Sequence, residues 1–350
     1  MSVKGEELGQ VRFATSEENL RGWVKEIKAR EIHLTIEAGP LTRWASKVLE
    51  PEVAKLIVCD PHYNRLVSKN AHKCDEVDVP ALCELQRLDA LHPVWVGPDE
   101  DRDVFRAAVY NLLKFRDQQR ELKGLIKNRY HEQGILSLNG REVFHPTKRQ
   151  AWIEKLAPER RHGFLLLYDL FDTALGAWTE QYREVMRLGR AYPEIELFME
   201  VPGIGEIGAH VFCAIIQDPF RFDTHQKLWR YCCLGITNRS SDGKPLGYER
   251  LDRRGRRELK TVSYHAWRTG VRANQKCDVI RRFYFASKER TGTARHGRLN
   301  TQRKILKTLW TMWKNRSHFD PDLFLQTPNP EPAGRRRRRR RPRRTRSRKG

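Results

Sequence analysis

Residues 32–61 read IHLTIEAGPLTRWASKVLEPEVAKLIVCDP. Two apolar, β-branched runs at the ends of this stretch predict strands, and the first of them ends at Glu37. The residues between the runs repeat at the spacing of a helix. The positions expected on the inward face of that helix are Leu41, Trp44, Ala45 and Val48. A strand, a helix and a second strand in this order predict a parallel strand pair with a helical crossover.

Further elements extend this pattern to about Pro98. A helix is expected from about Asp75, and the segment PVWVG (93–97) is expected to form another short strand. Helices that alternate with short β-rich runs predict an α/β domain with a largely parallel sheet. We assign residues 1–98 to this domain.

The chain then becomes polar and helical. Residues 100–134 and 148–189 predict two long helices, the second interrupted near Pro158. One apolar stripe lies along the first helix, at Phe105, Val109, Leu112 and Leu113. We predict a helical hairpin or coiled coil over residues 99–195, in which the stripe either packs internally or mediates dimerisation. A mainly α C-terminal domain is expected over residues 196–325.

The charge of the chain is strongly positive, at a formal +23. Residues 335–350, RRRRRRRPRRTRSRKG, contain eleven Arg, one Lys and no acid, which accounts for 12 of the +23 and leaves +11 for the rest. A basic body with a basic tail predicts binding to a polyanion, of which nucleic acid is the simplest. For the tail alone, predicted as a disordered segment over residues 326–350, a solubilising or localising role is the alternative.

Composition also excludes several classes of protein. The longest apolar run, GFLLLYDLF (163–171), is too short to span a bilayer, and the opening MSVKGEELGQ lacks the apolar core of an export signal. We therefore expect a cytoplasmic protein that does not bind membranes. The seven cysteines are odd in number and form no CxxC pair, so we expect buried, reduced thiols rather than disulfides or a zinc site.

Two acids lie close together in AHKCDEVDVPAL (71–82), where Asp75 and Asp78 follow Lys73. Three residues apart at the start of a helix, they lie on one face and repel each other unless a cation lies between them. The pair therefore indicates a possible metal site. The alternative is an exposed acidic helix start that the helix dipole favours.

Two segments of the C-terminal region carry further chemistry. In VPGIGEIGAHVFCAII (201–216), Gly203 and Gly205 predict a tight turn between apolar helices, whose amides can hold a phosphate as in helix-hairpin-helix contacts with DNA. A plain packing turn is the alternative. Residues 236–260 place Ser240 and Ser241 in a glycine-bearing loop, where serines are often only polar filler. The basic residues around these serines are Arg239, Lys244, Arg250, Arg253, Arg254, Arg256 and Arg257.

The order of these segments resembles that of a known family. The segments are IEAG, KCDEVD, VPGIG, RFDTHQKLWRYCCLGITNRSSDGK and RRGRRELK. Together they are similar to the DEDD-type transposases of bacterial insertion sequences, also called bridge recombinases and related to the pilin-gene invertases. The similarity runs from about Val11 to Phe324. It implies a RuvC-like, RNase H-type fold for the N-terminal domain, a transposase domain at the C-terminal end, and an enzyme that cuts and rejoins DNA.

The resemblance also implies roles for particular residues. Glu37, Asp75 and Asp78 would bind Mg²⁺, which holds the DNA phosphate. Ser241 would attack the phosphodiester as the nucleophile, with Ser240 as the alternative because Asp242 stands where the family often has a glycine. The residues implied in DNA or RNA contacts are Lys73, Gly203, Gly205, Arg239, Lys244, Arg253, Arg254, Arg256 and Arg257.

The resemblance also implies the partners of the chain. They are DNA, a guide (bridge) RNA and further copies of the chain in a dimer or tetramer. The expected location is the bacterial cytoplasm, in association with the nucleoid. The family pattern opens with an aspartate on a first strand, whereas this chain has no Asp before Asp60, so that strand is expected to be missing. Two other functions remain open: an inactive remnant that still binds nucleic acid, and a Mg²⁺-dependent junction nuclease that uses water.

Overall fold

The computed structural model covers most of the chain in two compact units, residues 1–100 (unit 1) and 101–350 (unit 2). The described residues are 1–61, 75–97, 99–237, 240–241, 244–245, 250–272 and 278–326, with only the backbone described at 75–77, 240–241 and 244–245. Lys73, Arg239 and the arginine tail lie outside these ranges.

The strand, helix and second strand predicted for residues 32–61 are confirmed. In unit 1, β1 (His33–Glu37) pairs in parallel with β2 (Lys55–Cys59), and α2 (Thr42–Leu49) and η1 (Glu50–Glu52) connect them. Val48 and Leu49 of α2 form a small core with Val24 of α1 (Glu17–Glu26). The register places Glu37 opposite Cys59, at the edge where both strands end.

Two other predictions for unit 1 are wrong. Leu41 and Trp44 do not face inward, since they are 56% and 37% exposed. Leu41 is the N-cap of α2 and precedes its first turn, so the covered face of this short helix begins only at Ala45. The strand predicted at PVWVG is reduced to a single antiparallel bridge between Cys59 and Pro93. Pro93 has no N–H group with which to extend a ladder.

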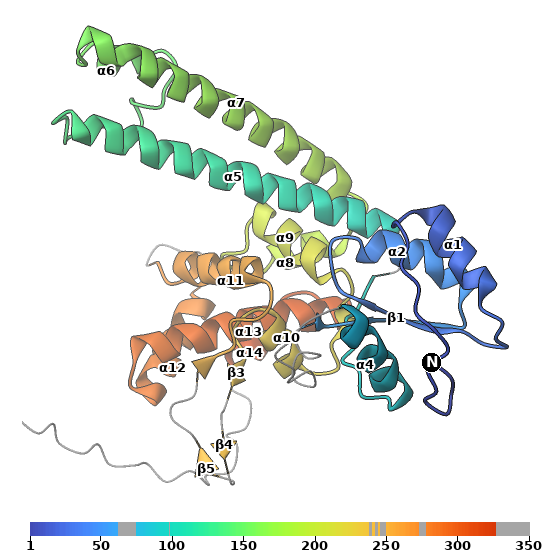
Figure 1. Ribbon diagram of the computed structural model, residues 1–350. Coiled ribbons are helices and arrows are strands. Elements are labelled where there is room, and N and C mark those ends of the chain that lie inside the picture. Colours follow the sequence, from blue (N-terminus) through green and yellow to red (C-terminus); the bar gives the residue numbers. More distant parts are fainter. Residues whose placement is uncertain are drawn as a thin grey trace, which may run out of the picture. The chain divides into compact units, whose positions relative to one another are not determined.

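The helix expected from about Asp75 is α4 (Asp75–Arg87), which contacts β1 (Figure 1). Unit 1 thus combines a parallel strand pair with helices, as an α/β domain would. Parallel pairing with one crossover is common to many α/β folds, so the RuvC-like class of this unit stays a prediction.

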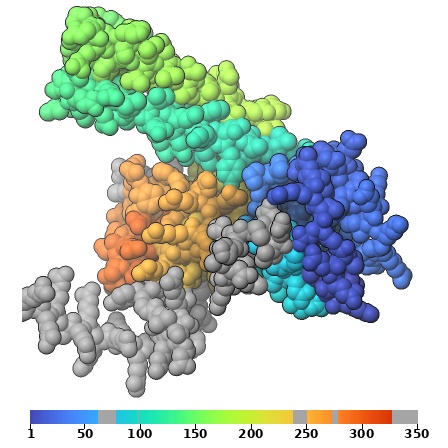
Figure 2. Space-filling view, viewed as in Figure 1, coloured from blue at the N-terminus to red at the C-terminus, as the bar shows by residue number. Residues whose placement is uncertain are grey.

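The two long helices of unit 2 form an antiparallel hairpin, as predicted. They are α5 (Glu100–Glu132) and α7 (Pro158–Gly189), with α6 (Gln150–Ile153) between them. Gln181 Nε2 donates to the Ala108 carbonyl at 3.1 Å, and the Tyr130 and Tyr168 hydroxyls hydrogen-bond at 3.2 Å near the other end. That end has its own apolar core and extends away from the other helices of unit 2 (green in Figures 1 and 2).

The apolar stripe of α5 packs internally. Phe105, Val109, Leu112 and Leu113 are at most 7% exposed and belong to the main core of unit 2. The sequence leaves open whether this stripe packs internally or mediates dimerisation, and the structure shows internal packing. The stripe thereby anchors the inner end of the hairpin to the C-terminal helices.

The remainder of unit 2 is mainly helical. Its helices are α8 (Glu194–Met199), α9 (Glu206–Ile216), η2 (Pro219–Arg221), α10 (His225–Tyr231), α11 (Arg257–Gly270), α12 (Val279–Thr291), α13 (Ala294–Asn315) and α14 (Pro321–Leu325). From Ala209 onward every residue of α9 is buried, because this helix is apolar on all sides. The long α13 contacts α8, α10, α11 and α12. These packed helices form the base from which the candidate functional segments project.

Two expectations from composition bear on the fold. Cys59, Cys213, Cys232 and Cys233 are buried free thiols, as predicted, whereas Cys83 is only partly buried. Cys74 and Cys277 lie outside the described residues. Within the described part of the chain, no helix combines the length and apolar character needed to cross a bilayer.

Candidate functional site

The carboxyl edge of the strand pair in unit 1 holds two acids. Glu37 is the last residue of β1 and is exposed. Asp60 directly follows Cys59, the register partner of Glu37, and its N–H donates to the His92 carbonyl at 3.0 Å. The sequence reasoning missed Asp60 as a site residue. Its position directly after the second strand could have identified it as a site residue. The carboxyl ends of parallel strands lie at the same edge of a sheet, so an acid at this position is expected near Glu37.

The predicted pair of aspartates lies on α4. Asp75 is its first residue and Asp78 is half-buried within the first turn. The side chain of Asp75 is outside the described atoms, so the convergence of Glu37, Asp75 and Asp78 stays a prediction. Among the described side chains, no group of three His, Cys, Asp or Glu residues lies close enough to hold a metal ion. Carboxylates are nevertheless the ligands that Mg²⁺ prefers, so the residue types fit that ion.

The serine segment, expected to be a glycine-bearing loop, contains a short β-hairpin. Ser240 and Ser241 form β4, which pairs in antiparallel fashion with β5 (Lys244–Pro245). At the base of this hairpin, β3 (Ile236–Thr237) pairs with β6 (Arg250–Leu251). The hairpin projects from the α10 and α11 ends of the helical base (Figure 1).

Asp252 holds the base of this hairpin. Only 8% of it is exposed, and its carboxylate accepts from the Arg254 N–H at 3.0 Å and lies 3.7 Å from Arg230 Nε. Its own N–H donates to the Gly235 carbonyl at 2.8 Å. The sequence reasoning missed this residue, although an isolated acid in the basic run LDRRGRR was a visible signal. A buried carboxylate with these partners fixes the hairpin to the helices.

The predicted arginine run lies beside the hairpin. Arg253, Arg254, Arg256 and Arg257 are all exposed. Burial lowers the pKa of Lys260, and the nearby Cys233 thiol partly opposes this shift. The positive charges of Arg257, Arg298 and Arg253 lower the pKa of Lys260 further. The cations in this region are therefore close enough to disfavour one another's charge. A bound polyanion would relieve that repulsion.

The predicted glycine turn connects α8 and α9. Gly203 has φ +83°, and a Cβ on it would lie 2.4 Å from the Ala266 carbonyl oxygen of α11, so only glycine fits. Gly205 is the N-cap of α9, with no side-chain cap on that helix end. The turn is confirmed, and the uncapped end of α9 lines the same cavity as Arg257, the last residue of the arginine run.

A cavity of about 410 Å³ opens at this turn. Its lining includes Gly203 and Gly205, Arg116 of α5, and Arg257 and His265 of α11, with the acids Asp117 and Glu258 also present. Burial, followed by the charges of Arg120, Arg116 and Arg268, lowers the pKa of His265. Amide donors and guanidinium groups around an apolar floor suit a phosphate-bearing ligand.

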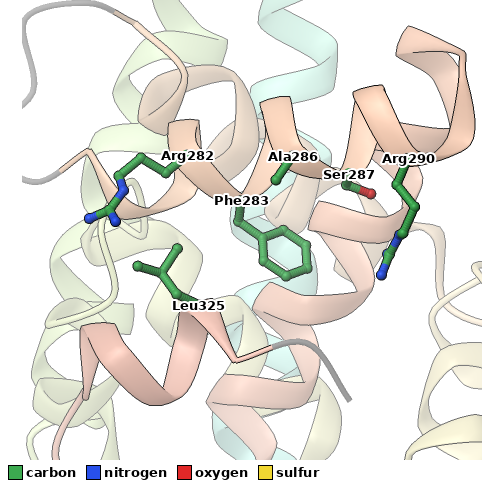
Figure 3. A pocket seen from close by; sticks show the side chains of 6 residues that line it. All are labelled: Arg282, Phe283, Ala286, Ser287, Arg290 and Leu325. Carbon is green, nitrogen blue, oxygen red and sulfur yellow. The ribbon is translucent and has the colours of Figure 1, made fainter. Parts of the chain in front are cut away.

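A second cavity, of about 350 Å³, lies beside α12 (Figure 3). Phe283 and Leu325 give it an apolar surface, and the Phe283 ring lies between the Arg282 and Arg290 side chains. The two arginines are about two helical turns apart on α12. The sequence reasoning did not single out these residues. They add a basic surface to the C-terminal helices.

Gly203→Ala is expected to lower the free energy of unfolding by at least about 2 kcal/mol, because it combines a positive φ with a clash against backbone. Gly205→Ala is the matched control, since φ is −94° there and a Cβ would meet nothing within 4 Å. Its cost should stay below about 1 kcal/mol. Chemical denaturation followed by circular dichroism measures both values. Equal stability of the two variants would contradict the packing of the turn on α11.

Comparison with known families adds the next observation. Residues 195–284 match the model of the transposase IS116/IS110/IS902 family. The match supports an insertion-sequence transposase. It includes the glycine turn, the serine hairpin, the arginine run and α11, whereas Glu37, Asp60 and the α4 acids lie outside it. No curated protein matches the chain.

A transposase of this kind acts on DNA, and the charge of the matched region agrees with that partner. Its exposed arginines and the cavity at the glycine turn lie on neighbouring parts of unit 2. Phosphate contacts of this type give affinity without sequence specificity.

Proposed function

We propose that the chain is a DEDD-type transposase, of the bridge recombinase group, that exchanges DNA strands with carboxylates and a serine nucleophile. The observation that carries the proposal is the family match over residues 195–284, because it contains the serines and most of the cations assigned to DNA. Unit 1 would supply the RuvC-like domain. The order of the segments along the chain supports this division.

Glu37, Asp75 and Asp78 would hold Mg²⁺, with Asp60 as a further acid at the edge occupied by Glu37. Bound Mg²⁺ would stabilise the negative charge that builds up on a phosphate under attack. The carboxylates would position the ion that contacts the phosphate. Without the ion the converging acids would repel one another, so the proposed site would bind Mg²⁺ at the expense of stability.

Ser241, with Ser240 as the alternative, would form the covalent intermediate. Its oxygen bonds to phosphorus while the phosphorus–oxygen bond to one strand breaks, and the serine proton passes to the departing oxygen. A hydroxyl of the incoming strand then reverses this step on the serine, so no external energy source is needed. Nearby cations, including Arg253 and Arg257, would neutralise the crowded phosphates.

The proposed partners follow from the same assignment. They are DNA, a guide RNA encoded with the element, and further copies of the chain in a dimer or tetramer. Association with the bacterial nucleoid would follow from DNA binding. The basic surfaces of unit 2 support contact with nucleic acid in general, and the guide RNA is proposed from the resemblance.

A junction nuclease is the second candidate function. The acids lie in unit 1 and the serines in unit 2, so attack by water at the acids would not require Ser241. This candidate and the transposase differ in one respect that can be measured. Only the serine mechanism joins protein covalently to DNA.

Removal of residues 335–350 is expected to weaken DNA binding without abolishing it, because +11 of the formal +23 remains. The slope of log affinity against log salt should become shallower by about 0.9 for each duplex phosphate that the tail no longer neutralises. Fluorescence anisotropy with a labelled duplex at several salt concentrations measures both quantities, and the full chain is the control. Loss of all binding at low salt would show that the tail was the entire binding site.

A further inference from the structure

Five aromatic rings form a continuous row from α11 to α12. His265, Tyr264 and Trp267 belong to α11, and Tyr284 and Phe285 belong to α12. The centroids of successive rings are 5.8, 5.5, 5.5 and 5.2 Å apart in that order. These spacings are those of contacting aromatic side chains. We call this set the aromatic row.

Four of the five rings of the row are at least partly exposed. His265 at one end is exposed, and Phe285 at the other is 46% exposed. Tyr264 and Trp267 are half-buried, and only Tyr284 is buried. The orange segments that include α11 and α12 form part of the surface in Figure 2. The His265 end also lines the cavity at the glycine turn. The row therefore begins at the candidate nucleic-acid site and leads away from it.

Cations lie over the rings of the row. The Arg298 guanidinium is 5.7 Å from the centroids of both Tyr264 and Trp267. Arg281 and Lys288 are each 5.9 Å from the Phe285 centroid. The cations of α11 and α12 outnumber the acids Glu258 and Glu289; they are Arg257, Lys260, Arg268, Arg281, Arg282, Lys288 and Arg290.

Two donors, one in the row and one beside it, have no partner within the described part of the chain. Arg298 Nε and Trp267 Nε1 are buried from solvent without a hydrogen-bond acceptor. An unpaired buried donor costs free energy, and a bound acceptor would recover it once the side chain turns the donor toward the surface. Phosphate and base oxygens are such acceptors.

We propose that the aromatic row binds unpaired nucleotides of a DNA or RNA strand. Bases would stack on Tyr264, Trp267 and Phe285, while Arg298, Arg281 and Lys288 meet the phosphates. Stacking on aromatic rings beside cations is how proteins hold single strands with little sequence preference, because every base offers a flat face. In a duplex those faces are already stacked. The inference rests on the proposed function, since strand exchange and a guide RNA both present unpaired nucleotides.

The test compares the double variant Tyr264→Leu, Phe285→Leu with Phe220→Leu in the full chain. Phe220 is the matched control, because it is 66% exposed and has the Lys314 ammonium 5.2 Å from its ring, but lies outside the row. Fluorescence anisotropy is measured with labelled oligo-dT, oligo-U and a duplex of equal length. We expect the double variant to bind single strands at least about fivefold more weakly, with unchanged duplex affinity. The control should match the original chain on all three probes.

Each outcome of the test has one reading. A loss for both oligo-dT and oligo-U supports a site for unpaired nucleotides in general, and a loss for one of them assigns the site to that strand type. Unchanged single-strand affinity, or an equal loss for the duplex, overturns the proposal. Failure of the original chain to bind any of the probes would instead overturn the proposed function.

A second variant keeps the test decisive if the double variant unfolds. Arg298→Met preserves the apolar stem and removes the guanidinium over Tyr264 and Trp267. For single strands, its salt slope should be shallower by about 0.7, because one phosphate is no longer neutralised. An unchanged slope with reduced thermal stability would make Arg298 purely structural and would contradict the proposal.

Discussion

Asp75→Asn is expected to reduce DNA strand transfer at least about a hundredfold while the chain stays folded. The substitution removes one of the carboxylates proposed to hold Mg²⁺, and with it the charge stabilisation at the phosphate. Because the acids repel one another without metal, thermal stability in the absence of Mg²⁺ should be unchanged or higher. Strand transfer is measured on DNA that carries the ends of the element, with RNA transcribed from its flanks.

Glu84→Gln is the matched control for this prediction. Glu84 is another acid of α4, but it pairs with Arg87 of the same helix, whose guanidinium lowers its pKa. Its loss should leave strand transfer and Mg²⁺ binding unchanged. Calorimetry should show weaker Mg²⁺ binding in Asp75→Asn and also in Asp60→Asn. Full Mg²⁺-dependent activity in Asp75→Asn would remove the α4 acids from the site.

Ser241→Ala is expected to eliminate the covalent protein–DNA adduct and the recombinant product together, a loss of at least about a thousandfold. The reason is that the strand-transfer step then lacks its attacking oxygen. Duplex DNA binding and Mg²⁺ binding should persist, because the cations and acids are intact. Denaturing gels of reactions stopped midway show the adduct as DNA of reduced mobility.

Ser240→Ala is the matched control, one residue away on β4. It should retain both adduct and product. The reverse result, with the adduct lost in Ser240→Ala and kept in Ser241→Ala, would transfer the nucleophile to Ser240. Product without any adduct in either variant would favour attack by water.

Short-range sequence patterns predicted the helices and strands whose formation depends mainly on neighbouring residues. The apolar runs of β1 and β2 and the stripe of α5 were recognisable by their spacing, and the structure buries that stripe as a helical face should be. Gly203 was predictable as a turn because its segment joins two apolar helices. Leu41 was placed wrongly because a periodicity does not reveal where a short helix begins. PVWVG was placed wrongly because its first residue cannot donate to a ladder.

The features that the sequence did not reveal depend on contacts between distant residues. Asp60 becomes a candidate only through the register that sets Cys59 opposite Glu37. Asp252 holds the base of the hairpin through its contacts with Gly235 and Arg230, which lie far before it in the sequence. The aromatic row joins rings of α11 and α12 that no single periodicity connects. In each case tertiary packing, rather than local preference, brings the chemistry together.

The most direct test of the serine mechanism is peptide mapping of the covalent intermediate. A strand-transfer reaction stopped midway is digested with nuclease and trypsin, and the peptide 240–250, SSDGKPLGYER, is examined by mass spectrometry. The proposed function predicts this peptide with a nucleotide attached through phosphate to Ser241. DNA strands cut in the presence of Mg²⁺, with this peptide recovered only in its unmodified form, would contradict it.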